Sequence, residues 1–165
     1  LCAVLTREID KALYNTYSDD IPAFLKNIYA ARSVTESQLE LSLPGLLKPN
    51  FDQLDVALNL LESAITENRR ILIVGDFDAD GATASAVAIK ALRMMGTKFV
   101  DFLVPNRFEH GYGLSPEIVN EAKKEKDPDL IITVDNGISS IEGTSLARSL
   151  GIDVIITDHH LPPII

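Results

Sequence analysis

Residues 71–81 read Ile71-Leu72-Ile73-Val74-Gly75-Asp76-Phe77-Asp78-Ala79-Asp80-Gly81, an apolar run followed at once by three aspartates. A short run that is apolar throughout is typical of a strand covered by helices on both faces of a parallel sheet. The alanine-rich segment 82–95 is expected to form a helix that Gly96 ends. This part of the chain therefore predicts a strand and a helix with acidic residues between them.

The same alternation continues toward the C-terminus. Apolar segments at 99–104, 130–134 and 154–156 are further strand candidates. Helices are expected at 116–124, after Ser115 as N-cap, and from Ser139 or Ser140 to 150, before Gly151. Alternating strands and helices imply right-handed βαβ units. The fold class predicted is α/β, a parallel sheet flanked by helices.

The first third of the chain has a different character. Residues 1–50 are irregular, with short helices expected at 23–31 and, from a capping box, at 35–38. Segment 52–68 has apolar residues at helical spacing. We therefore expect a helical or irregular lead-in over 1–50 and an α/β domain over 51–165. A sequence that starts at Leu1 rather than Met and stops just after a polar cluster is expected to be a piece of a longer protein.

Polar side chains stand at the end of every predicted strand. They form four segments: Asp76 to Gly81, Pro105-Asn106-Arg107, Asp135-Asn136-Gly137 and Thr157-Asp158-His159-His160. Ligands of open parallel sheets bind at the carboxyl ends of the strands. The four segments are therefore expected to meet in one crevice.

The composition of that crevice indicates metal chemistry. It would hold five carboxylates and two imidazoles, and carboxylates this close repel one another unless cations offset their charge. Oxygen ligands with imidazole suit Mn²⁺ or Mg²⁺ better than Zn²⁺ or Fe²⁺. Two ions about 3.5–4 Å apart, bridged by a carboxylate, are suited to phosphoester hydrolysis.

Other interpretations of the acidic segment fit less well. An EF-hand loop needs a helix before it and a glutamate at its twelfth position, which here is Val87. A haloacid-dehalogenase-type phosphatase also has Asp-x-Asp after its first strand, but a later His-His pair is unusual there. No P-loop or dinucleotide-binding glycine pattern is found in the sequence. Taken alone, Asp135 would pass as a turn residue.

Asp158-His159-His160 after a strand, with Asp76-x-Asp78-x-Asp80-Gly81 upstream, resembles the DHH phosphoesterase superfamily. Segments 75–83, 104–114 and 133–139 resemble its bacterial single-stranded-DNA exonucleases, and the likeness extends into residues 25–34 and 44–45. The resemblance implies 5′-to-3′ hydrolysis of single-stranded DNA to mononucleotides in recombination and repair. It also implies a fourth metal-binding motif and further domains, which are not found in these residues, so full activity is expected of the complete protein.

The resemblance also implies roles for particular residues. The metal ligands expected from it are Asp76, Asp78, Asp80, Asp135, Asp158, His159 and His160, with Asp78, Asp80, Asp135 and His159 as the first choices. Catalytic roles fall to Asp76 (metal or water), Asp135 (bridging two ions) and His160 (scissile phosphate), while Asp158 either ligates or orients a histidine. Arg107 and Asn136 are expected to bind substrate, although an ordinary surface ion pair is an equal reading of Arg107.

Bulk properties limit the partners. The net charge of −9 disfavours a simple DNA-coating module but suits carboxylates that hold cations. The single cysteine, Cys2, and the lack of an apolar run of about 20 residues favour a cytoplasmic protein without a membrane partner. Single-stranded DNA, a single-strand-binding protein and a helicase are the partners that the resemblance implies.

Two rivals to the exonuclease remain open. Other branches of the superfamily hydrolyse short oligonucleotides, cyclic dinucleotides or pyrophosphate, although the stretch 106–113 favours the exonuclease branch. A non-catalytic DNA-binding scaffold is the other rival. The presence of every acid and both histidines of the three motifs counts against it.

Overall fold

The computed structural model describes residues 6–40, 42, 52–106 and 111–162. Contacts within the chain divide it into two units, Leu1–Phe51 and Asp52–Ile165, and each unit is described by itself. The expected division into a lead-in over 1–50 and an α/β domain over 51–165 stays a prediction. None of the helices among the described residues has the length and apolar character needed to cross a membrane.

The first unit consists of short helices. They are α1 (Lys11–Tyr14), α2 (Ala23–Ala30) and the 3₁₀ helix η1 (Glu36–Leu39). The predicted capping box is present, with the side chains of Thr35 and Gln38 each bonded to the other residue's backbone. Helix α1 was not predicted, because four residues are too few to show a helical period.

The second unit alternates strands and helices after a first helix. Its elements are α3 (Leu54–Thr66), β1 (Ile71–Gly75), α4 (Ala79–Met94), β2 (Val100–Leu103), α6 (Pro116–Glu125), β3 (Leu130–Val134), α7 (Ile141–Ser149) and β4 (Asp153–Thr157). All three strand pairings are parallel, and the strand order is β2-β1-β3-β4. This confirms the predicted α/β fold with a parallel sheet flanked by helices.

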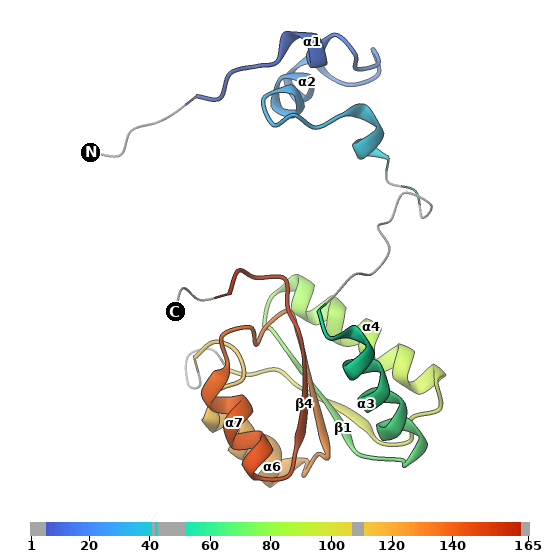
Figure 1. The fold of residues 1–165 in the computed structure, drawn as a ribbon, viewed down its shortest axis with the longest axis vertical. Coiled ribbons are helices and arrows are strands. Elements are labelled where there is room, and N and C mark those ends of the chain that lie inside the picture. Colours follow the sequence, from blue (N-terminus) through green and yellow to red (C-terminus); the bar gives the residue numbers. More distant parts are fainter. Residues whose placement is uncertain (1–5, 41, 43–51, 107–110, 163–165) are drawn as a thin grey trace, which may run out of the picture. The chain divides into compact units, whose positions relative to one another are not determined.

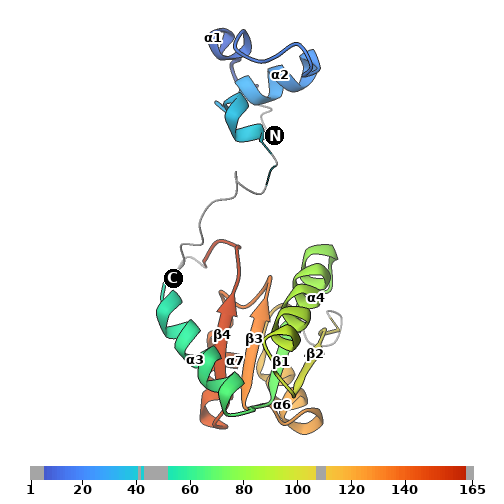
Figure 2. The same ribbon diagram turned by 90° about the vertical axis from the view of Figure 1, so that its right-hand side faces the viewer.

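Two apolar cores cover the two faces of the sheet, because side chains alternate along each strand. Leu72, Val74 and Ile131 pack with buried residues of α6 and α7. Ile71 and Ile73 pack on the other face against α3 and α4. Figures 1 and 2 show the sheet between these two helix pairs. The helices that follow β1 and β3 therefore pack on opposite faces of the sheet. In parallel sheets, ligands bind at the carboxyl ends of two such strands.

Helix α4 begins earlier than predicted, at Ala79 rather than Ala82. Asp78 causes this, because its carboxylate accepts a hydrogen bond from the backbone N–H of Gly81 at 3.1 Å and caps the helix. Gly81 itself sits against the main chain of Asp76, where an added Cβ would lie 2.5 Å from the carbonyl oxygen. The acidic segment is thus partly a tight helix start, which brings Asp80 into the first helical turn.

Candidate metal centre

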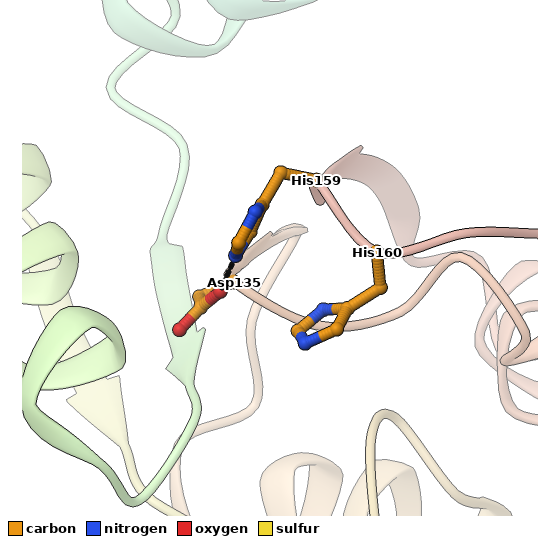
Figure 3. Close-up of side chains that lie close together, drawn as sticks. All are labelled: Asp135, His159 and His160. Atoms are coloured by element: carbon orange, nitrogen blue, oxygen red, sulfur yellow. Dashed lines mark ion pairs between the residues drawn. The ribbon is translucent and has the colours of Figure 1, made fainter. Parts of the chain in front are cut away.

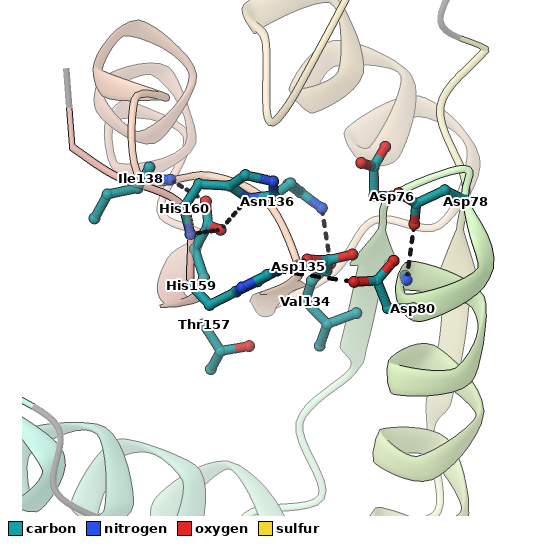
Figure 4. Close-up of polar contacts among 12 residues, drawn as sticks. Asp76, Asp78, Asp80, Val134, Asp135, Asn136, Ile138, Thr157, His159 and His160 are labelled. Carbon is teal, nitrogen blue, oxygen red and sulfur yellow. Dashed lines mark hydrogen bonds and ion pairs between the residues drawn. The ribbon is translucent and has the colours of Figure 1, made fainter. Parts of the chain in front are cut away.

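The ends of β1, β3 and β4 lie level with one another. Gly75 pairs with Val134, and Val134 pairs with Thr157. The next residues along each strand are Asp76, Asp135 and Asp158, so acidic side chains leave three neighbouring strands at the same edge of the sheet. Figure 4 shows Asp135 between the aspartates of the β1–α4 connection and the histidines that follow β4.

Asp135 is the residue common to both possible metal-binding groups found among the described residues. One group is Asp76, Asp78 and Asp135, and the other is Asp135, His159 and His160. In each group the candidate ligand atoms lie within 4.8 Å of one another. The backbone of Asp135 has a φ of 64°, an uncommon value for a residue other than glycine. A functional site is a frequent place for such a conformation.

The carboxylate of Asp135 is buried without the donors that a buried anion needs. The residue is 9% exposed, and no backbone N–H of the described part of the chain donates to either carboxylate oxygen. The His159 ring lies against it, with Nε2 2.8 Å from Oδ1 (Figure 3). Burial and the charges of Asp80 and Asp78 raise the pKa of Asp135. A buried carboxylate that lacks backbone donors and lies beside other ligand atoms fits a divalent cation.

The three aspartates between the end of β1 and the first turn of α4 differ in their surroundings. Asp76 is buried, and its Oδ1 accepts a hydrogen bond from the N–H of Phe77 at 2.8 Å. The hydrogen bond from Gly81 lowers the pKa of Asp78, so this carboxylate stays ionised. Asp80 is exposed, with an oxygen 3.8 Å from His159 Nε2, and belongs to neither group of the described residues. Asp76 and Asp78 are thus better placed than Asp80.

Both carboxylate oxygens of Asp158 accept hydrogen bonds from the protein. Its Oδ2 accepts a hydrogen bond from the N–H of Ile138 at 2.9 Å, and its Oδ1 accepts from the N–H and Nδ1 of His160 at 3.0 and 2.7 Å. Burial raises the pKa of Asp158, but these hydrogen bonds outweigh it and the net pKa is lowered. Of the two roles expected for Asp158, this geometry favours orienting His160 over ligating a metal.

Asn136 joins the two strand ends from which the central acids leave. It is 1% exposed, and its amide nitrogen donates hydrogen bonds of 3.0 Å to the carbonyls of Val74 and Val134. Both amide hydrogens are therefore used, and only the Oδ1 atom is left for the expected substrate contact. That contact stays a prediction, as does the phosphate contact of Arg107, which lies outside the described residues.

Tyr112 is a site residue whose role could not be predicted from the sequence. Its hydroxyl lies 3.2 Å from His160 Nδ1 and 3.3 Å from the carbonyl oxygen of Asp135. Burial and four neighbouring carboxylates raise the pKa of Tyr112 to about 12. The available signal was an aromatic residue between Gly111 and Gly113, whose φ values of 76° and 78° mark an unusual backbone path.

The sequence of this chain is similar to a family model and to curated relatives. The N-terminal domain of the DHH family matches residues 70–165. The single-stranded-DNA-specific exonuclease RecJ of Dickeya dadantii is 54% identical over 87% of this chain and 25% of its own length. RecJ of Escherichia coli is 49% identical over 94% of this chain and 27% of its own length. The chain thus spans about a quarter of the length of the curated relatives that it matches.

Solved structures give the same result. A crystal structure of exonuclease RecJ bound to manganese matches with a TM-score of 0.62 and 38% identity, over 73% of this chain and 30% of that one. RecJ of Thermus thermophilus with Mn²⁺ matches with a TM-score of 0.63 and 29% identity, over 92% of this chain and 20% of that one. Its complex with Mg²⁺ gives 0.50 and 25%, over 90% and 17% of the respective chains. The domain match over residues 70–165 shows that the chain belongs to the DHH family, and the relatives described above, which match most of its length, are RecJ exonucleases.

Proposed function

We propose that this chain is the metal-binding part of an exonuclease that hydrolyses phosphodiester bonds in single-stranded DNA. The observation that carries the proposal is the buried carboxylate of Asp135, which accepts no hydrogen bond from a backbone N–H of the described residues and belongs to both groups of ligand atoms. A structural aspartate would be bonded to backbone or side-chain donors, as Asp158 is. The names of the relatives supply the substrate class.

The proposed cofactor is a pair of Mn²⁺ or Mg²⁺ ions. Asp76 and Asp78 would hold one ion, His159 and His160 would lie at the other, and Asp135 would be shared. Asp80 is proposed as an additional ligand from the rim. When bound, the ions supply Lewis acidity toward a phosphate oxygen and toward the attacking water. The manganese- and magnesium-bound RecJ structures support this choice of metal.

The remaining roles belong to the protein's own side chains. Asp158 holds the Nδ1 side of His160, which leaves Nε2 for a metal or for the scissile phosphate. Asn136 holds the ends of β1 and β3 together, and so fixes the distance between the backbones that carry Asp76 and Asp135. Hydrolysis by activated water needs no covalent enzyme intermediate.

The finer parts of the proposal rest on the resemblance to RecJ. They are 5′-to-3′ polarity, release of mononucleotides, a setting in DNA recombination and repair, and partnership with a single-strand-binding protein and a helicase. The rivals are another phosphoesterase of the same family, acting on oligonucleotides, cyclic dinucleotides or pyrophosphate, and a DNA-binding scaffold without catalysis.

The test uses the complete protein that contains this chain, Mn²⁺, and single-stranded DNA labelled at the 5′ end. We expect labelled mononucleotide as the first product and little release from duplex DNA. Asp135→Asn keeps the shape of the side chain and removes its charge, so activity should fall by more than about 100-fold. This loss is larger than the one expected for a residue that only orients a metal ligand. Asp55→Asn, the same change at an exposed position on α3, is the matched control.

The rivals give different results in the same experiment. A scaffold would bind the labelled strand without product, and calorimetry would show no Mn²⁺ binding. A phosphoesterase of another branch would cleave a dinucleotide or pyrophosphate faster than the long strand. Equal activity of Asp135→Asn and Asp55→Asn would refute the role given to Asp135.

A further inference from the structure

Tyr112 reaches the candidate metal centre from a part of the chain that supplies none of its candidate metal ligands. It lies in the connection between β2 and α6, whereas Asp135 follows β3 and His160 follows β4. Its hydroxyl lies within 3.3 Å of both the Asp135 carbonyl oxygen and His160 Nδ1. Through its hydroxyl oxygen, Tyr112 therefore links the connection before α6 to the residues that follow β3 and β4.

The hydrogen-bond roles at this oxygen follow from its neighbours. His160 Nδ1 lies 2.7 Å from a carboxylate oxygen of Asp158, so Nδ1 carries a proton and donates it. The Tyr112 oxygen, 3.2 Å from Nδ1, can only be a second and weaker acceptor of that single hydrogen, and its own hydrogen is directed to the Asp135 carbonyl at 3.3 Å. The Tyr112 hydroxyl thus donates to the backbone of Asp135 and lies beside the Nδ1–H that His160 donates mainly to Asp158.

Ring packing adds a second restraint. The Tyr112 and His160 rings meet edge to face, with centroids 5.9 Å apart and an interplanar angle of 84°. The hydroxyl and the ring of Tyr112 thus contact the same imidazole whose Nδ1 is hydrogen-bonded to Asp158. His160 is exposed, so these contacts restrict a ring that would otherwise have rotational freedom.

The loop that carries Tyr112 is itself fastened. The N–H of Leu114 donates to the hydroxyl of Ser140 at 2.9 Å. Gly113 has a φ of 78°, and a Cβ there would lie 2.8 Å from the same Ser140 oxygen. The connection before α6 therefore packs against the connection between β3 and α7. The two residues that follow Tyr112 in the chain are held by this contact with Ser140.

We propose that Tyr112 is a positioning residue, which fixes the His160 ring through its hydroxyl and ties that ring to the main chain of Asp135. This inference rests on the proposed function only for the role of His160 at the metal or the scissile phosphate, and its test does not need an active nuclease. Residues that orient metal-ligating histidines change metal affinity or activity by about 10–100-fold when they are altered. Tyr112 shares this task with Asp158, so a smaller effect of roughly 3–10-fold is expected.

The experiment compares Tyr112→Phe with the unaltered chain. Phenylalanine keeps the edge-to-face contact and removes only the hydroxyl. In the metal-free chain with ¹⁵N-labelled histidine, we expect the Nδ1–H proton of His160 to shift and to exchange faster with water. Mn²⁺ affinity, measured by calorimetry, should fall by roughly 3–10-fold. Tyr29→Phe, on α2 in the other unit, is the matched control and should leave both measurements unchanged.

A second comparison covers the case in which Tyr112→Phe also lowers the melting temperature. The same substitution is made together with His160→Gln, and the drop should then largely disappear if the hydroxyl acts through the imidazole. An equal drop in both backgrounds, or an unchanged His160 proton in Tyr112→Phe, overturns the proposal. Lack of nucleotide release by the unaltered complete protein would count against the proposed function alone, because the histidine spectra are recorded without metal or DNA.

Discussion

Replacing Asn136 by alanine is expected to destabilise the second unit and to weaken its metal binding at the same time. The side chain is buried and donates two hydrogen bonds of 3.0 Å, to the carbonyls of Val74 and Val134. Each bond contributes about 0.5–1.5 kcal/mol net, so the pair contributes about 1–3 kcal/mol. Truncation also leaves a small cavity, which brings the expected cost to about 2–4 kcal/mol.

Thermal unfolding followed by circular dichroism measures this cost. For a unit of this size, 1 kcal/mol corresponds to about 4 °C, so the melting temperature should fall by about 8–16 °C. Asn120→Ala is the matched control, because Asn120 is exposed on α6 and alanine favours helices. Mn²⁺ affinity should fall in Asn136→Ala even well below its melting temperature, since the ends of β1 and β3 lose their cross-link. If Asn136→Ala melts within a degree or so of Asn120→Ala, the reasoning about strand ends is wrong.

Three further outcomes are expected. Gly81→Ala should lower the free energy of unfolding by about 1–3 kcal/mol, because its Cβ would lie 2.5 Å from the carbonyl oxygen of Asp76; a gain in urea unfolding experiments, as helix propensity alone predicts, would contradict this. The hydrogen bond from Arg70 lowers the pKa of Asp129, so this pair's stabilisation is present above the ordinary carboxyl pKa of 3.8 and is lost as the pH falls below it. Urea midpoints should therefore fall less steeply with acid in Arg70→Gln, and parallel curves would exclude the pair as a cause. Without metal, Asp135→Asn should raise the melting temperature, because it removes a buried charge beside other carboxylates. Saturating Mn²⁺ should reverse this order, since about 2.7 kcal/mol of binding stabilisation at 100 times Kd is available only to the unaltered chain; the same order in both conditions would argue against a metal at Asp135.

The arrangement of the sheet could be predicted from the sequence because its strands carry their own signal. Each of β1 and β3 is an apolar run buried along its whole length. A polar residue directly after such a run lies at the carboxyl edge of a parallel sheet, whichever order the strands take. This rule predicted that Asp76 and Asp135 lie at the same edge, and their close approach follows because β1 and β3 are parallel neighbours in the structure.

Side-chain partners could not be predicted in the same way. The sequence shows Asp78 and Asp158 as two more acids, but one caps a helix and the other binds a histidine and a backbone N–H. The contacts of Asn136 and Tyr112 join residues 62 and 48 positions apart in the chain. Such contacts depend on which loops the fold brings together, and no local pattern encodes that.

The acids of the site also differ in what holds them. Asp78 and Asp158 accept hydrogen bonds from backbone N–H groups, so each is stabilised by its own loop or by the neighbouring one. Asp135 has no such bond from the described residues, and burial together with the charges of Asp80 and Asp78 raises its pKa. The charges of Asp80 and Asp78 act on Asp135, and among the described residues its ion-pair partner is His159. An acidic edge built in this way is stable enough to fold and still has a strong preference for a cation, which is the combination that a reversible metal site requires.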